Sequence, residues 1–387
     1  MTTSARQTAH SVLVAVERGG FASDLLEARA RLLDAREAGL ATEIVFGVLR
    51  RRAQLDWLIA QVSSRPPEKL DTAVRVALEA GAYQLRFLER VPAHAAVNET
   101  VELVRHAGKA SAAGLVNAVL RRLPNLPSRW PDLQTELSLP KILFDRWQRN
   151  FGTEVAVGIG QASLNRPAMF VRIPRRAEGD SPAEEAMLEP AEVPGAWLLR
   201  SGAPPPGARI MDIGSQAVAA LLETRAGERV LDACAAPGNK SAQLMESGAV
   251  VIACDDSPRR LRAFLAPCAL RVQLDASQPL PFAAQCFDKI LVDAPCSGTG
   301  TLARNPEIRW RFSEKDLIRH QQRQIRILRN ALLCLKPGGR LVYSTCSLEP
   351  EENQHVVDAV AKNRVTHVMQ RLPGRDPGDG FWAAVLE

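Results

Sequence analysis

The stretch ERVLDACAAPGNKSAQLMES, residues 228–247, combines an apolar strand pattern, a turn of small residues and the start of a helix. Small side chains in such a turn let a ligand approach the backbone, and the N–H groups of the helix start point toward that ligand. The turn lacks the GxGxxG pattern of dinucleotide-binding folds, so it does not favour a dinucleotide cofactor. Taken alone, it is also compatible with an ordinary connection between a strand and a helix.

Strand and helix patterns alternate on both sides of this stretch, from residue 206 to the end of the chain. Further strands are predicted at 249–256, 271–277, 287–295, 338–347 and 381–387, and helices at 257–266, 315–335 and 351–363. Such alternation predicts an α/β fold with a doubly wound, mostly parallel sheet. Sheets of this kind bind ligands at the carboxyl ends of their strands.

Polar clusters lie at those strand ends, which is hard to obtain by chance. They are residues 232–240, Asp255 with Asp256, Asp275, residues 293–297 and residues 345–347. An acid at the end of the second strand typically accepts hydrogen bonds from ribose hydroxyls, so Asp255, or alternatively Asp256, is expected to do so. Asp275, after the third strand, is expected to hold a base amino group.

Two cysteines at strand ends stand out, Cys296 in DAPCSGTG and Cys346 in STCSLEPEEN. A free cysteine in a strand is usually an inert small hydrophobe, but small polar neighbours can stabilise a thiolate. A thiolate that adds to carbon 6 of a pyrimidine makes carbon 5 nucleophilic toward a methyl donor, and a carboxyl group at the ring nitrogen stabilises the adduct. The base must leave its stack for this attack. The acidic residues after Cys346 are predicted to open a helix.

The amino-terminal half lacks this alternation of strand and helix patterns. Residues 1–125 show helical spacing of apolar residues, and residues 126–205 form a proline-rich connecting subdomain. Arginines cluster in this helical half. The net charge of the whole chain, +6, weakly favours a polyanionic partner. The candidates for phosphate contacts are Arg50, Arg51, Arg52, Arg121 and Arg122. The alternative interpretation is a solvated helix face.

The length and composition limit the number of domains and the class of protein. A chain of 387 residues predicts two or three domains, and 46% hydrophobic with 24% charged residues is typical of a globular protein. Seven cysteines without a CxxC pair predict neither a disulfide framework nor a zinc module. No membrane span or signal peptide pattern is found, so we expect a cytoplasmic protein. The six histidines show no metal-ligand spacing, so we expect no metal. A monomer is our expectation for the oligomeric state.

Together, VLDACAAPGNKS, FDKILVDAPCSGTGTLARNPEIRW, KPGGRLVYSTCSLEPEENQHVV and GDGFWAA resemble the RNA (cytosine-5)-methyltransferases. IVFGVLRRRAQLDWLI, PAHAAVNETVELVR and GLVNAVLRRLP resemble the NusB-like RNA-binding domain. The combination is similar to the RsmB (Sun/Fmu) type of 16S ribosomal RNA methyltransferase. The resemblance implies a NusB-like domain at 1–125 and a Rossmann-like methyltransferase domain at 206–387. It also implies S-adenosyl-L-methionine as cofactor and 16S ribosomal RNA as partner, with a cytosine in the helix 31 loop as target.

The resemblance also implies roles for matching residues. Cys346 would be the nucleophile, Cys296 would assist release of the product as base or through its own thiol, and Asp293 would contact the cytosine ring. Spacing alone cannot assign these thiol roles, since DNA (cytosine-5)-methyltransferases use the other cysteine. The residues expected to line the cofactor site are Cys234, Ala235, Ala236, Pro237, Gly238, Asn239, Lys240, Asp255, Asp275 and Asp293. Asn239 replaces a usual glycine, and we expect the turn to survive because Asn tolerates a left-handed backbone.

Three alternatives remain open from the sequence. The same chemistry could act on transfer RNA or another ribosomal site, because the catalytic domain type serves several RNAs. A NusB-like binding module with an inactive second domain is a second alternative, which the intact Cys296, Cys346 and Asp293 argue against. A nicotinamide dehydrogenase on the same sheet type is a third, and the missing GxGxxG and the thiol pair argue against it.

Overall fold

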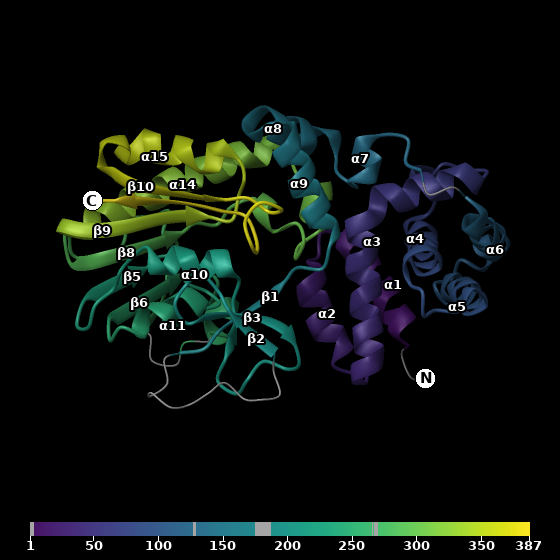
Figure 1. The fold of residues 1–387 in the computed structure, drawn as a ribbon, viewed down its shortest axis with the longest axis horizontal. Coiled ribbons are helices and arrows are strands. Elements are labelled where there is room, and N and C mark those ends of the chain that lie inside the picture. The colour runs from purple at the N-terminus through teal and green to yellow at the C-terminus, as the bar shows by residue number, and fades with distance from the viewer. Residues whose placement is uncertain (1–3, 127–128, 175–186, 265, 267–269) are drawn as a thin grey trace. The chain divides into compact units, whose positions relative to one another are not determined.

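The computed structural model describes residues 4–126, 129–174, 187–264, 266 and 270–387. The chain forms two compact units (Figure 1). The first unit comprises Met1–Asn165 and Leu302–Arg311, and the second comprises Arg166–Thr301 and Phe312–Glu387. This division differs from the predicted boundaries at 125 and 205, because the connecting region is shared between the two units. Its helices belong to the first unit and its strands to the second.

The first unit is helical, as predicted. Its longer helices are α1 (Ala5–Glu17), α2 (Ala22–Ala30), α3 (Ala35–Val62), α4 (Thr72–Phe87), α5 (Ala93–His106), α6 (Ala113–Arg122), α7 (Leu133–Glu136), α8 (Lys141–Phe151) and α9 (Thr153–Leu164). Side chains cap several of these helices: Ser4 forms a capping box at α1, and Asp34 accepts a hydrogen bond from the backbone N–H of Glu37 at α3. The apolar faces of α1, α3 and α4 enclose one core, in which Ile44, Leu58 and Leu78 are fully buried.

Close packing between α3 and α4 depends on a glycine. The Tyr83 ring of α4 lies over Gly47 of α3, and a Cβ added at Gly47 would lie 1.9 Å from a ring carbon. The Tyr83 hydroxyl donates a hydrogen bond of 2.6 Å to the Glu43 carboxylate. Gly47 therefore leaves the space that the Tyr83 ring occupies between the two helices.

The segment Leu302–Arg311 belongs to the helical unit although it follows the predicted methyltransferase motif DAPCSGTG. Its Arg309, in the short helix α13 (Ile308–Arg311), is 1% exposed. The guanidinium donates hydrogen bonds of 3.0–3.3 Å to four backbone carbonyl oxygens, those of Arg50, Ser138, Ser163 and Leu302. Burial and the nearby Arg50 lower the pKa of Arg309 to about 9. One side chain thus joins α3, the loop before α8, and α9.

We expect Arg309→Met to destabilise the protein by about 3 kcal/mol or more, since the substitution leaves buried carbonyl groups without donors. This loss should lower the melting temperature by roughly 6 °C or more. Thermal unfolding by circular dichroism measures the shift, with Arg36→Met, an exposed position on α3, as the matched control. Equal melting temperatures for the two variants would contradict this account of Arg309.

The second unit is built on a seven-stranded sheet of order β10-β11-β9-β8-β5-β6-β7. Its strands are β5 (Arg229–Asp232), β6 (Val250–Asp255), β7 (Leu270–Gln273), β8 (Phe287–Asp293), β9 (Leu335–Thr345), β10 (Val365–Arg371) and β11 (Phe381–Leu386). Strands β5 to β9 pair in parallel, and β11 pairs antiparallel with both β9 and β10. The predicted doubly wound fold is confirmed, and β10 is a strand that the sequence analysis missed. The strand order reverses between β5 and β8, which is where such sheets bind ligands.

Helices cover both faces of this sheet (Figure 1). Helices α14 (Glu314–Cys334) and α15 (Gln354–Ala361) pack on the face that carries Leu231 and Ile290. Helix α10 (Ile213–Ala220) contributes to the core on the opposite face, together with Val230 and Leu291. The remaining helices of this unit are α11 (Asn239–Met245) and α12 (Pro258–Arg262). Neighbouring strand residues therefore point to opposite cores, which explains why the strands read as continuous apolar runs.

A smaller sheet of order β2-β3-β1-β4 precedes the large one. Its strands are β1 (Met169–Arg172), β2 (Met187–Pro190), β3 (Ala196–Ser201) and β4 (Arg209–Ile210). Arg172 of β1 makes a bidentate ion pair with Glu246, at 2.7 and 2.5 Å, just after α11. This pair ties the small sheet to the helix that follows the turn at residues 233–238.

No helix in the described ranges combines the length and apolar character needed to cross a membrane. No group of three or more His, Cys, Asp or Glu side chains in the same part of the chain is arranged to hold a metal ion.

Candidate active site

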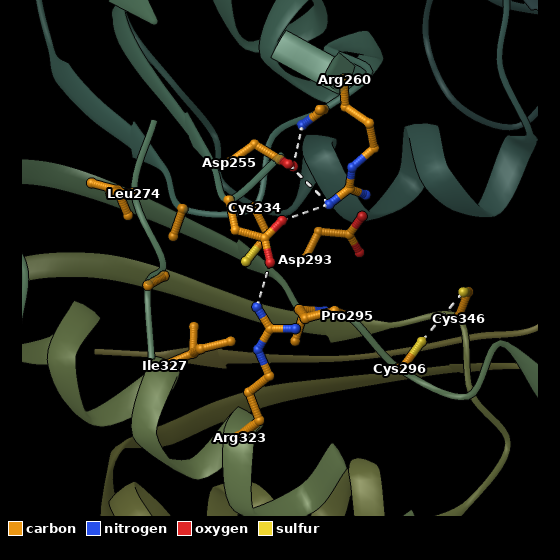
Figure 2. Close-up of a pocket in the computed structure, with 15 residues that line it drawn as sticks. Cys234, Asp255, Arg260, Leu274, Asp293, Pro295, Cys296, Arg323, Ile327 and Cys346 are labelled. Atoms are coloured by element: carbon orange, nitrogen blue, oxygen red, sulfur yellow. Dashed lines mark hydrogen bonds and ion pairs between the residues drawn. The ribbon is translucent and has the colours of Figure 1, made fainter. Parts of the chain in front are cut away.

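A cavity lies at the carboxyl ends of β5, β6, β8 and β9 (Figure 2). Most of the polar strand-end clusters predicted from the sequence contribute to it. Its lining includes Cys234, Ala236, Asp255, Asp256, Arg260, Asp293, Pro295, Cys296, Arg323 and Cys346. The sheet therefore brings both predicted thiols and the predicted cofactor turn to one cavity, as the parallel strand order requires.

The two thiols are close neighbours. The Sγ atoms of Cys296 and Cys346 lie 3.4 Å apart, within hydrogen-bond distance for sulfur, and point toward one another (Figure 2). The N–H of Gly300, in the loop after Cys296, donates a 2.9 Å hydrogen bond to the carbonyl of Cys346. The hydrogen bond with Cys346, burial and the negative charges of Glu352 and Asp293 raise the pKa of Cys296 well above its ordinary value. Cys296 is therefore a neutral thiol at physiological pH, able to donate to its neighbour.

Asp293 ends β8 beside the thiols. One carboxylate oxygen accepts a 2.7 Å hydrogen bond from Lys240 Nζ, and the other accepts a 2.8 Å bond from the Ser344 hydroxyl. Burial opposes the charge on Lys240, but Asp293 outweighs it and raises the pKa of the ammonium group. Lys240 also lies over the Phe381 ring at 5.5 Å. Asp293 is thus fixed in direction by two donors on the wall of the cavity.

The turn between β5 and α11 requires a glycine. Gly238 has φ of +103°, and a Cβ there would lie 2.9 Å from the Phe264 ring. Asn239 begins helix α11 and lies outside the left-handed region, so the turn forms without the left-handed conformation that Asn was expected to tolerate. The left-handed position is Gly238, which the departure from the usual motif leaves intact. A buried Asn239 Oδ1 without a partner among the described residues fits a site that receives a ligand donor.

Acidic residues border the same turn. The Asp255 carboxylate accepts hydrogen bonds from the backbone N–H groups of Ala236, at 3.2 Å, and Ser257, at 2.9 Å. Arg260 lies 2.9 Å from the same carboxylate. A carboxylate held in this way presents its remaining lone pairs in a fixed direction, as recognition of ribose hydroxyls requires. These features fit a nucleoside-containing cofactor.

Asp275 lies at the margin of this region rather than among the lining residues, which are its neighbours Leu274 and Ala276. Burial opposes its ionisation, but hydrogen bonds from Ser277 and the charge of Arg323 outweigh burial and lower the pKa of Asp275. Arg323 of α14 joins Asp275, at 3.5 Å, to Asp256, at 2.6 Å.

Comparisons with known proteins match both units of the chain. Residues 3–125 match the model of the NusB family, and residues 219–380 match the model described as 16S rRNA methyltransferase RsmB/F. The ribosomal RNA small subunit methyltransferase B of Klebsiella pneumoniae is 34% identical over 417 residues, which cover 98% of this chain and 96% of that protein. The chain belongs to the RsmB/F methyltransferase family.

Solved structures agree with the fold of this RsmB/F family member. The crystal structure of PH0851 covers 99% of this chain and 98% of its own, with a TM-score of 0.83 and 20% identity. The crystal structure of NSun6 from Pyrococcus horikoshii with SFG covers 64% of this chain and 98% of its own, with a TM-score of 0.51 and 21% identity. The predicted family, the fold class and the enzyme class, an RNA methyltransferase, are confirmed, and the dehydrogenase alternative is wrong.

The basic residues of the RsmB/F protein fall into two groups. Arg50 is buried and donates to the carbonyl of Ala303, Arg51 lies over the Phe87 ring, and Arg52 pairs with Glu17. These contacts favour a structural contribution, and the expectation of phosphate contacts is wrong for Arg50 because its side chain is inaccessible. Arg121 and Arg122 are exposed at the end of α6.

Sequence reasoning missed three charged residues of this site. Arg260 and Arg323 lie on helices that the sequence predicts. The spacing of residues along these helices does not indicate that the two arginine side chains line the cavity. Glu352 was expected to open a helix with its acidic neighbours. Instead it ends a short 3-10 turn, Pro350–Glu352, and is fully buried beside Ser297. Its position within the motif PEEN offered no signal that distinguishes it from Glu351.

Proposed function

We propose that the protein transfers a methyl group to carbon 5 of a cytosine in 16S ribosomal RNA through a covalent adduct with Cys346. The observation that carries the proposal is the pair of thiols 3.4 Å apart in one cavity with Asp293 and the glycine turn. A structural pair of cysteines would not require a half-buried carboxylate beside it that is held by two hydrogen bonds.

In this mechanism Cys346 attacks carbon 6 of the flipped base, which makes carbon 5 nucleophilic. Asp293 stabilises the adduct by a hydrogen bond or proton at the ring nitrogen, and Lys240 and Ser344 hold Asp293 in place. Cys296 assists release of the product, by taking the carbon 5 proton or by giving its own proton to the leaving sulfur. The raised pKa of Cys296 supports transfer of its own proton to the leaving sulfur, because a neutral thiol has a proton to give.

We also propose S-adenosyl-L-methionine as the cofactor, which when bound supplies an electrophilic methyl group. Asp255 would hold its ribose, and the backbone around Gly238 would lie against its amino acid portion. The family membership and the neighbouring structure with SFG support this assignment. The helix 31 loop remains the proposed target within the RNA.

The proposal is tested by incubating the protein with labelled S-adenosylmethionine and unmodified 16S RNA, with transfer RNA as a parallel substrate. Nucleoside analysis should find labelled 5-methylcytosine at one position of 16S RNA. Equal or greater transfer to transfer RNA would contradict the assignment of substrate. Absence of transfer to any RNA would contradict the assignment of activity.

Arg121 and Arg122 are proposed as phosphate contacts of the helical unit. We expect Arg121→Gln combined with Arg122→Gln to raise KM for 16S RNA roughly 10-fold and to reduce the salt slope of binding by about 2, because each phosphate contact releases counterions. The kcat value should not change, since neither residue touches the reacting base. Arg36→Gln on α3 serves as the control for loss of an exposed arginine elsewhere on the helical unit. An unchanged KM and salt slope in the double variant would exclude this surface.

A further inference from the structure

Glu352 is a buried acid to which the mechanism above gives no part. Its side chain is fully buried, which is costly for a carboxylate unless donors surround it. Oε1 accepts hydrogen bonds from the Ser297 N–H, at 2.8 Å, and from Gln324 Nε2, at 3.2 Å, and Oε2 accepts from the Ser297 hydroxyl, at 2.5 Å. Its backbone carbonyl accepts a 2.6 Å bond from the Tyr343 hydroxyl. Both carboxylate oxygens therefore hold Ser297, the residue that follows Cys296.

A network of hydroxyl groups joins the loops that carry the two thiols. The Ser297 hydroxyl lies 3.1 Å from the Ser347 hydroxyl, so the residues after Cys296 and after Cys346 are in contact. Ser347 in turn accepts a 3.0 Å hydrogen bond from the backbone N–H of Glu349. The chain places Glu352 at one end of this network and the thiol pair at the other.

We propose that Glu352 is a positioning residue that acts through Ser297 and holds Cys296 against Cys346 for release of the methylated product. The inference rests on the proposed function. Cys346 directly follows β9, whose pairing with β8 fixes its backbone, so it depends less on Glu352 than Cys296 does. Loss of Glu352 should therefore impair release more than attack.

The release step can be written in full. Cys296 starts as the neutral thiol and gives its own proton to the Cys346 sulfur, as the bond between carbon 6 and that sulfur breaks with its electron pair on sulfur. The carbon 5 proton passes to the Cys296 sulfur in its place, and the electron pair of the C5–H bond closes the double bond between carbons 5 and 6. Both residues end as thiols and no further reactant is needed. The transfer requires that the two sulfurs stay in contact, and the Glu352 carboxylate maintains that contact through Ser297.

Glu352 also contributes charge. The groups that act on Cys296 are Cys346 at the end of β9, Glu352 itself and Asp293 at the end of β8, and Tyr343 of β9 also interacts with it. Each negative charge raises the pKa of the thiol, so removal of the Glu352 charge should lower the pKa of Cys296. In a plot of the adduct decay rate against pH, the transition caused by ionisation of Cys296 should then move to lower pH.

The test measures the covalent protein–RNA adduct in single turnovers with 16S RNA, resolving its formation from its decay. Glu352→Ala should slow adduct decay roughly 10- to 100-fold while formation changes less than about 3-fold. Glu352→Gln, which keeps an acceptor for Ser297, should recover most of the decay rate and shift its pH profile to lower pH. Asp358→Asn, on the exposed side of α15, is the control for loss of a carboxylate in the same region and should behave as wild type.

A double variant separates positioning from general damage. If Glu352 acts through Cys296, adding Glu352→Ala to Cys296→Ala should slow decay no further than Cys296→Ala alone. Equal losses in both backgrounds, or wild-type decay in Glu352→Ala, would overturn the inference. Should Glu352→Ala not fold, Ser297→Ala removes the hydroxyl contact and should slow decay by itself, and wild-type decay there would count against it. A wild-type protein that forms no 5-methylcytosine would instead overturn the proposed function.

Discussion

Cys346→Ala is expected to abolish methyl transfer to 16S RNA, with a fall in kcat of at least roughly 10³-fold. Carbon 5 of a free cytosine is a poor nucleophile, and in the proposed mechanism only the bond from the Cys346 sulfur to carbon 6 activates it. Removal of a nucleophile in other enzymes produces losses of this size or larger. The measurement is incorporation of labelled methyl groups at saturating RNA and cofactor.

The comparison with Cys286→Ala makes this result specific. Cys286 is also a free, half-buried cysteine of the same unit, but it does not line the cavity. It should therefore retain wild-type transfer. Cofactor binding by Cys346→Ala, measured by calorimetry, should stay within about 3-fold of wild type, because the proposed cofactor contacts lie on the other side of the cavity. Substantial methyl transfer by Cys346→Ala would mean that another group attacks the base.

Cys296→Ala is expected to trap the enzyme on its RNA. Attack by Cys346 and methyl transfer should proceed, whereas elimination should slow by roughly 10²-fold because the neighbouring thiol is gone. The expected readout is a protein–RNA species that survives denaturing electrophoresis and carries labelled methyl groups. Multiple-turnover activity should fall to a similar extent.

Two outcomes would contradict this assignment for Cys296. If Cys296→Ala forms no adduct and no product, Cys296 takes part in attack rather than in release. If it turns over at the wild-type rate, the 3.4 Å contact between the sulfurs has no catalytic consequence. Cys296→Ser tests the chemistry further, since a hydroxyl keeps a hydrogen-bond donor on a side chain of the same connectivity but lacks the acidity of a thiol.

The sequence predicted much of the catalytic unit because the carboxyl ends of parallel strands lie at the same edge of the sheet. Cys296 and Cys346 follow strands β8 and β9, which pair directly, so the alternation of strands and helices was enough to expect one shared cavity. The same rule located Asp255 and Asp293. Strand β10 was missed because its pattern, half exposed along most of its length, lacks the continuous apolar run of the central strands.

Contacts between distant segments could not be predicted in the same way. Arg309 lies close to the catalytic motif in sequence, yet its guanidinium is buried among carbonyl groups of residues 50, 138 and 163. Arg50 reads as part of a basic surface run but is buried against Ala303. Local sequence patterns predict helices, strands and turns. The partners of a side chain in distant segments depend on tertiary packing, which these patterns do not describe. The burial of Glu352 was hidden for the same reason.

Mapping the cysteine that carries the RNA tests the central claim most directly. Cys296→Ala would be incubated with 16S RNA and S-adenosylmethionine, digested with protease and nuclease, and the cross-linked peptide identified by mass spectrometry. The account predicts a methylated cytidine attached to Cys346, in the peptide that contains STCSLEPEEN. Attachment to any other residue, or a stable adduct formed equally well by Cys346→Ala, would contradict it.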